Sequence, residues 1–207
     1  MQVNRNSRKF FALFLAALFF LTAGTMAAQA PSGVPVFKVA PGQSSIKFDV
    51  EASVAIEGDF KKWDATLTFT SPNVTDGTLF IKIDAASVNT GSGMKDGKLK
   101  SDDFFDVKKN PYITFKSTKV VQTGPNTFEL DGDFTIRGVT KQEKLSLNLS
   151  PGSRGTGHGT VTGTMAFDRK DYGMNSGIPF IKIANRVEVT VNLTADRISG
   201  PPVKLQQ

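Results

Sequence analysis

The stretch Ile46-Lys47-Phe48-Asp49-Val50-Glu51-Ala52 decides the fold, because apolar and charged residues alternate along it one by one. Successive side chains of a β-strand point to opposite faces of a sheet, so this alternation predicts a strand with one buried and one solvent-facing side. The apolar set continues to Val54 and Ile56. We therefore expect one long, half-buried strand over this segment.

Seven further segments repeat this pattern, and turn-forming residues separate them, as at Ser71-Pro72-Asn73 and Gly124-Pro125-Asn126. Their apolar positions are Trp63, Leu67 and Phe69; Leu79, Ile81 and Ile83; Ile113 and Phe115; Phe128, Leu130, Phe134 and Ile136; Leu145, Leu147 and Leu149; Val161, Met165 and Phe167; and Val187, Val189, Val191 and Leu193. The mature chain therefore reads as eight strands.

Helical signals are almost absent from the rest of the chain. Lys98 to Val107 could hold one short helical turn, with Leu99, Phe104 and Phe105 as its apolar face. Short, regularly spaced strands without helices predict an all-β sandwich or closed barrel, and eight strands are a natural number for closure. Abundant charges on the polar face favour a water-soluble barrel. Its interior is either filled by side chains or holds one small ligand.

The N-terminus has the three-part pattern of a secretory signal peptide. Arg5, Arg8 and Lys9 precede an apolar run from Phe10 to Leu21, and small residues follow up to Ala28. The run is shorter than the roughly 20 residues that a membrane-spanning helix needs. We expect residues 1–28 to be removed, which predicts a protein in the periplasm or secreted, without a stable membrane anchor.

The composition excludes several classes of function. The chain has no cysteine, so disulfides, thiolate metal sites and cysteine nucleophiles are absent. The net charge is +6, and the expected signal peptide carries three basic residues and no acid, which leaves +6 − 3 = +3. This modest surplus argues against a nucleic-acid partner.

The central part of the chain contains three distinctive segments: Val88-Asn89-Thr90, Met94 to Asp106, and Asn110-Pro111-Tyr112-Ile113-Thr114-Phe115. In these segments the chain resembles the YceI-like family of polyisoprenoid-binding proteins. Further similar pieces follow in the family's order: Pro41 to Phe48, Gly58-Asp59-Phe60, Asp131 to Thr140, and Arg169-Lys170-Asp171-Tyr172-Gly173-Met174. The resemblance covers residues 37–196, flanked by a flexible N-terminus at 29–36 and a C-terminal tail at 197–207.

The resemblance implies an eight-stranded antiparallel, lipocalin-like barrel whose long cavity holds an extended isoprenoid or similar amphiphilic lipid, in the bacterial periplasm. The chain departs from the family at two positions where members often carry histidine, which here read Glu51-Ala52-Ser53 and Lys98-Leu99. A head-group or metal role of such histidines does not transfer.

The candidate ligand-binding residues are apolar positions on the expected inward face and in the motifs that carry the resemblance. They are Phe48, Val50, Leu67, Phe69, Ile81, Leu99, Phe104, Phe115, Phe134, Phe167, Tyr172 and Met174. The basic residues Lys95, Lys98 and Lys100 form either a solvated loop or a site for an anionic head group. Phe104 and Phe105 could fill the barrel end or gate a ligand.

Three classes of function remain open: a lipid carrier, a stress-related structural protein without a specific ligand, and an enzyme acting on a bound amphiphile through rim residues such as Tyr172 or Arg169. His158, the single histidine, lies among glycines and lacks a nucleophile motif. Asp102, Asp103 and Asp106 lack calcium-loop spacing. We expect no catalytic residue, cofactor or metal, and a homodimer is left open.

Overall fold

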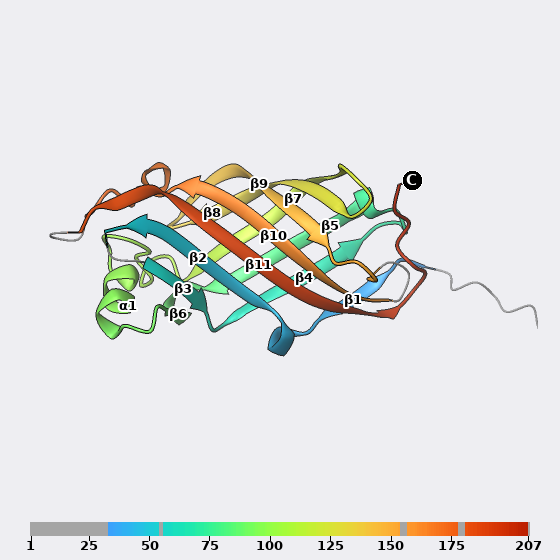
Figure 1. Cartoon of the computed structure of the whole chain (residues 1–207), viewed down its shortest axis with the longest axis horizontal. Helices are drawn as coiled ribbons and strands as arrows, with labels where there is room; N and C mark the ends of the chain where they lie inside the picture. The colour runs from blue at the N-terminus through green and yellow to red at the C-terminus, as the bar shows by residue number, and fades with distance from the viewer. Residues whose placement is uncertain (1–32, 54–55, 154–156, 178–180, 207) are drawn as a thin grey trace, which may run out of the picture.

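A single, strongly curled antiparallel sheet makes up most of the protein in the computed structural model (Figure 1). The structure describes residues 33–53, 56–153, 157–177 and 181–206. The expected signal peptide and most of the expected flexible N-terminus lie outside these residues. The strands run obliquely along the long axis, with the helix α1 at one end and the C-terminus at the other.

The described residues contain strands, one α-helix and short 3-10 turns. The strands are β1 (Val36–Val39), β2 (Ser45–Ala52), β3 (Ile56–Phe60), β4 (Trp63–Phe69), β5 (Gly77–Asp84), β6 (Val88–Asn89), β7 (Tyr112–Gln122), β8 (Thr127–Ile136), β9 (Val139–Leu149), β10 (His158–Asp168) and β11 (Ile183–Ser199). The helix is α1 (Gly93–Lys100), and the 3-10 turns are η1 (Pro41–Gln43), η2 (Val74–Asp76), η3 (Ala85–Ser87) and η4 (Arg169–Tyr172). No helix in this part of the chain has the length and apolar character needed to cross a membrane.

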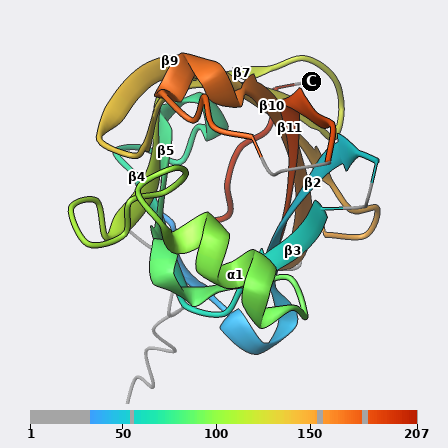
Figure 2. The same ribbon diagram turned by 90° about the vertical axis from the view of Figure 1, so that its left-hand side faces the viewer.

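The strand order β4-β5-β7-β8-β9-β10-β11-β2-β3-β6 follows the chain almost throughout, as expected for a meander. β1 pairs with the far end of β11. The ring of Phe37 on β1 lies 5.8 Å from the ring of Phe69 on β4. β4, which begins the strand order, therefore lies close to β1 and to the end of β11 with which β1 pairs. Viewed from the α1 end, the sheet curls into a barrel (Figure 2).

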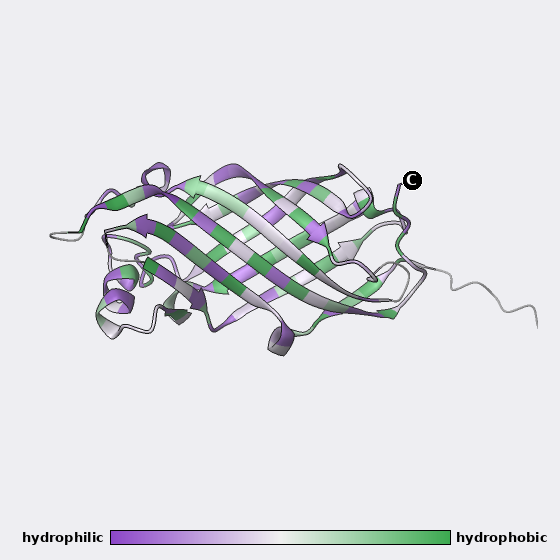
Figure 3. Ribbon diagram, viewed as in Figure 1, coloured by the Kyte–Doolittle hydropathy of each residue, from purple (hydrophilic) through white to green (hydrophobic). Residues whose placement is uncertain are grey.

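The alternation of the opening stretch is confirmed. Ile46, Phe48 and Val50 of β2 are buried, whereas the charged residues between them are exposed. Val50 pairs with Val187 and Phe48 with Val189 on β11, which places the apolar faces of both strands on the inside. The same bands of apolar and polar residues cross the neighbouring strands (Figure 3).

The predicted fold class, all-β with a lipocalin-like barrel and one short helix, is confirmed, but the sheet has 11 strands instead of eight. The run expected as one strand over 46–56 is a hairpin, in which Ile56 of β3 pairs back with Val50 of β2. β1, β3 and β6 have only 2 to 5 residues each. Strands this short contain too few residues for an alternating pattern to be recognised in the sequence.

The helix and the two ends also differ from the expectation. α1 begins at Gly93 because Ser92 caps it, with its hydroxyl accepting from the Lys95 amide, so Phe104 and Phe105 follow the helix. Pro35 is fully buried, β1 begins at Val36, and β11 continues to Ser199. Pairing of β1 with β11 therefore extends the folded domain beyond residues 37–196.

Candidate functional site

The barrel interior contains two apolar cavities. The larger, about 430 Å³, lies beside α1 and is called the α1-end cavity. The smaller, about 200 Å³, lies at the other end beneath residues 202–205 and is called the C-terminal cavity. Volumes of about 300–1,000 Å³ are typical of small-ligand sites, so only the α1-end cavity is of that size by itself.

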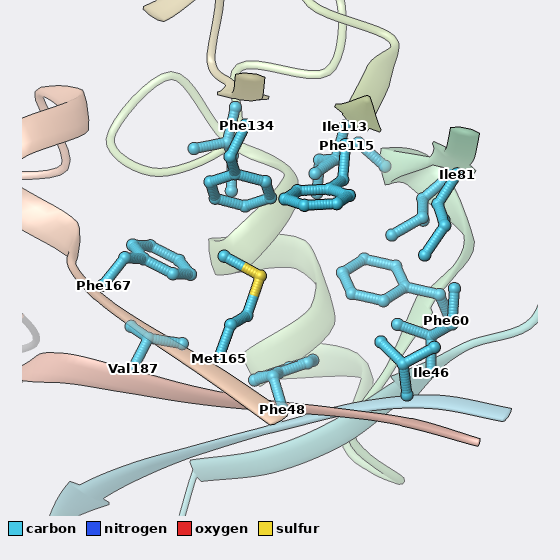
Figure 4. Packing of buried hydrophobic residues seen from close by; sticks show 14 of the residues in the cluster. Ile46, Phe48, Phe60, Ile81, Ile113, Phe115, Phe134, Met165, Phe167 and Val187 are labelled. Atoms are coloured by element: carbon cyan, nitrogen blue, oxygen red, sulfur yellow. The ribbon is translucent and has the colours of Figure 1, made fainter. Parts of the chain in front are cut away.

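A layer of buried side chains separates the two cavities and is called the waist. Its members come from β5, β7, β9, β10 and β11 and line neither cavity: Ile81, Phe115, Leu145, Met165 and Val191. Along β5, for example, Ile83 lines the α1-end cavity and Leu79 the C-terminal cavity, with Ile81 between them. Figure 4 shows Ile81, Phe115 and Met165 reaching into the interior.

Gly132 makes room for the waist. A Cβ at this position would lie 2.6 Å from the Phe115 ring and 2.7 Å from the Lys116 carbonyl oxygen, both closer than such contacts allow. The ring of Phe115 can therefore lie against the backbone of β8, where any larger residue would push it away. The Phe115 ring can therefore fill the interior between the two cavities.

Most of the residues expected to bind a ligand line the α1-end cavity. They are Phe48, Val50, Leu99, Phe104, Phe134, Phe167 and Met174, together with Lys95 and Lys98. Phe105 also lines it, so both phenylalanines of the pair are buried and border the cavity. The strands, the helix and the 173–177 loop thus all contribute side chains to one chamber.

The other expected residues lie elsewhere. Leu67 and Phe69 line the C-terminal cavity, and Ile81 and Phe115 belong to the waist. Lys100 lines neither cavity, because it follows Leu99 on the helix and the two side chains point in different directions. Tyr172 is completely buried and borders neither cavity.

Tyr172 fills a gap between β9 and β10. These strands pair only from Thr164 to Val161 of β10, and they diverge towards the α1 end. The Tyr172 ring packs edge-on against Phe134 and Phe167, at centroid distances of 5.5 and 5.3 Å. Its hydroxyl donates to Glu143 Oε1 at 2.7 Å. Burial and this carboxylate raise the pKa of the Tyr172 hydroxyl far above its ordinary value, so it stays protonated.

Asp103 ties together the segments that close the α1-end cavity. Its carboxylate accepts hydrogen bonds from Lys98 Nζ of α1 and, at 2.7 Å, from Ser176 Oγ in the 173–177 loop. The Lys98 bond and then the Ser176 bond hold the pKa of Asp103 below its ordinary value. The Lys98 ammonium, expected as a head-group candidate, is therefore already paired with a carboxylate.

Arg137 braces the same end from the β8–β9 turn. This turn is formed by Arg137 and Gly138, both with positive φ, as the tight hairpin turns of antiparallel strands require. The Arg137 guanidinium donates to the Gly173 carbonyl oxygen at 2.6 Å and to that of Asp103 at 3.3 Å. Left-handed backbone is uncommon for arginine, and here it directs the side chain over the barrel end.

The C-terminal segment covers the opposite end. Lys204 exchanges backbone hydrogen bonds with Pro72 and Val74, and the Gln122 side-chain amide bonds both the backbone nitrogen and the carbonyl oxygen of Gln206. Pro202, Val203 and Leu205 thereby line the C-terminal cavity. Residues 202–206, which were expected to belong to a C-terminal tail, are held in place and cover the C-terminal cavity.

The sites considered for other chemistry have structural partners. His158 begins β10 and its Nδ1 lies 2.6 Å from Asp196 Oδ1, with both side chains more than half exposed. Asp103 is bound as described above, and Asp106 pairs with Lys109. Within the described ranges, no three His, Asp or Glu residues gather as a metal site would require.

Several residues of the α1-end cavity were missed. Period-two alternation could have found Ile46, Ile83, Ile113, Ile136, Val187 and Val189, since all lie on strands in phase with predicted inward residues. Arg169 carries no such signal. It lines the cavity, is buried, and was considered only as a rim residue of an enzyme.

A curled antiparallel sheet around an apolar chamber defines a lipocalin-like barrel with an internal cavity. The chain belongs to the YceI-like family, whose domain pattern matches residues 37–195. Among its relatives, a UPF0312 protein of Pseudomonas savastanoi is 31% identical over 127 residues, and one of Vibrio parahaemolyticus is 32% identical over 129 residues. The matches cover 60% and 62% of this chain and 66% and 68% of those relatives, respectively.

Solved structures share the fold. BcnA of Burkholderia cenocepacia superposes with a TM-score of 0.68 at 23% identity, covering 76% of this chain and 99% of that chain. A Campylobacter jejuni YceI protein gives 0.57 at 26% identity, covering 68% and 84%. A polyisoprenoid binding domain from Saccharophagus degradans gives 0.63 at 16% identity, covering 79% and 99%.

Proposed function

We propose that this protein is a carrier that binds a long-chain isoprenoid or similar amphiphilic lipid in the α1-end cavity. The observation that carries the proposal is a chamber of about 430 Å³ whose wall is made almost wholly of Phe, Ile, Val, Leu and Met side chains. A related fold described as a polyisoprenoid binding domain supports the choice of ligand class.

The physical need for such a carrier is clear. Burying one CH₂ group is worth about 0.8 kcal/mol, so a five-carbon isoprene unit in water costs roughly 3–4 kcal/mol relative to an apolar surrounding. A chain of several units therefore leaves a membrane very slowly by itself. An apolar chamber within a water-soluble barrel offers it a second apolar surrounding.

A transfer experiment tests this function. Liposomes that contain a fluorescent prenol are mixed with the protein and then removed by centrifugation, and the prenol that stays with the protein is measured. We expect stoichiometric transfer to the wild type and almost none to Val50→Trp, in which an indole would occupy the cavity. Equal transfer to both proteins, or none to either, would contradict a carrier that uses this chamber.

We further propose that the carrier acts in the periplasm or outside the cell, after removal of residues 1–28. The support is the signal-peptide pattern of the sequence. N-terminal sequencing of protein purified from its own host should find Ala28 or Gln29 as the first residue. Functional, water-soluble protein that begins at Met1 or Gln2 would overturn this proposal.

A further inference from the structure

Arg169 is the one charged side chain that is buried among the described residues, at 6% exposure. It lies in the wall of the α1-end cavity, surrounded there by apolar residues such as Phe167 and Met174. A buried cation is costly unless hydrogen bonds and an opposite charge compensate it. The partners of this guanidinium therefore decide what the site can bind.

Backbone carbonyl groups hold the guanidinium in place. Nε donates to the carbonyl oxygen of Ala184 at 3.1 Å, and Nη1 donates to those of Ser176 at 3.0 Å and of Met174. In the part of the chain that the structure describes, no residue accepts a hydrogen bond from Nη2 and no carboxylate pairs with Arg169. One edge of the guanidinium is thus fixed, and its full charge has no anionic partner.

Three acids near the α1 end of the barrel are engaged with other groups. Asp103 accepts from Lys98 and Ser176, Glu143 accepts from Tyr172, and Asp171 lies 3.4 Å from Lys141. Each of these carboxylates belongs to a contact that holds the α1 end together. None of these three carboxylates pairs with Arg169 in the part of the chain that the structure describes.

Holding the loop does not by itself require a charge. A neutral side-chain amide offers two N–H donors, and carbonyl groups accept from such donors as well as from a guanidinium. Arginine adds a permanent charge and a planar set of donors that matches the oxygens of a carboxylate or phosphate. In an apolar chamber such a charge attracts an anion more strongly than it would in water.

We infer that Arg169 anchors the head group of an acidic lipid: Nη2 donates to a carboxylate or phosphate oxygen, while the lipid chain occupies the α1-end cavity. This inference rests on the proposed function and names the class of lipid. Lys95 lines the same cavity on the α1 side. The neutral prenol and the acidic lipid should therefore bind in the same chamber with different affinity.

Farnesol, farnesoic acid and farnesyl phosphate test the inference, because they share one isoprenoid chain and differ in the head group. We expect the wild type to bind both acids at least about tenfold more tightly than farnesol by calorimetry, a difference of about 1.4 kcal/mol. The preference should persist in high salt, since a buried charge is screened little. Inorganic phosphate alone should not compete, because it lacks the chain.

Variants assign the preference to a residue. Arg169→Gln should bind the acids about as weakly as farnesol while farnesol affinity stays nearly unchanged, and Arg169→Lys should keep part of the preference. Lys100→Gln, which removes a cation that borders neither cavity, is the matched control and should bind like the wild type. The wild-type comparison remains decisive even if Arg169→Gln folds poorly.

The outcomes separate this inference from the carrier function. If the wild type binds all three ligands equally, Arg169 only holds the loop, and the carrier function stands. If Arg169→Gln keeps the full preference, another group binds the anion and the assignment is wrong. If none of the three binds, the carrier function and the inference fail together.

Discussion

The two ends of the barrel are built from the same strands but close differently. The α1 end is covered by side-chain bonds around Asp103 and has Arg169 and Lys95 in the cavity wall. The C-terminal end is covered by a chain segment that is held mainly through its backbone at Lys204. Under the proposed function, this difference favours a bound amphiphile with its head group at the α1 end and its chain pointing towards the waist.

The largest expected effect distinguishes the waist from the cavity wall. Phe115→Ala removes a ring from a filled layer and should lower the free energy of unfolding by about 3–5 kcal/mol. Phe105→Ala removes a ring that already borders open space and should cost less than about 2 kcal/mol. Urea denaturation of the ligand-free proteins measures both values. Equal losses would mean that the interior is not divided as described.

Enlarging a valine should separate the same two regions by ligand binding. Val50→Trp should keep its fold and lose prenyl-ligand affinity by more than about tenfold, because the indole takes up space in the α1-end cavity that the ligand would occupy. Val191→Trp, the matched variant in the waist, should be destabilised by about 1–3 kcal/mol through overpacking. Thermal unfolding and ligand titration check both. A Val50→Trp protein that unfolds, or that binds normally, would show that no open chamber exists there.

A smaller effect concerns the C-terminal cover. Truncation after Pro201 removes the backbone bonds of Lys204 and the Gln122–Gln206 pair, and exposes the apolar wall of the C-terminal cavity. We expect a loss of about 1–2 kcal/mol in stability, in line with a few hydrogen bonds. Affinity for an acidic prenyl ligand should change less than about threefold. A large loss of affinity would move the ligand, in whole or part, to this end.

The smallest effect is a pH dependence of the α1 end. The pKa of Asp103 lies below its ordinary value of 3.8 because Lys98 and Ser176 donate to its carboxylate. Stabilisation from such a group is complete above the unfolded pKa and is lost as the pH falls through the folded pKa. NMR shifts of the Ser176 and Lys98 amides should therefore move below about pH 4, and Asp103→Asn should abolish the movement. An unchanged titration in Asp103→Asn would remove Asp103 as the cause.

The strands and their inward-facing residues could be predicted from the sequence because apolar and polar residues alternate locally. Phe48, Val50 and Phe134 were correctly placed on the inward face because strand side chains alternate. That pattern cannot tell which inward residues touch open space, so Phe115 and Phe48 looked alike. The division of the interior into two cavities depends on Gly132 of β8. Because Gly132 has no side chain, the Phe115 ring of the paired strand β7 can lie against it.

Arg169 and Tyr172 needed the tertiary structure. Their neighbours in the sequence predict only a turn, whereas their roles come from Ala184, Glu143 and Phe134, which are distant along the chain. The divergence of β9 from β10 that admits Tyr172 has no local signal either.

Native mass spectrometry of protein purified from its own host tests the central claim most directly. We predict that the wild type carries a non-covalent adduct with the mass of one acidic lipid, released by organic solvent, and that Val50→Trp purified in parallel carries none. An unmodified mass for the wild type under conditions that preserve lipid complexes would contradict the account, as would an equal adduct on both proteins.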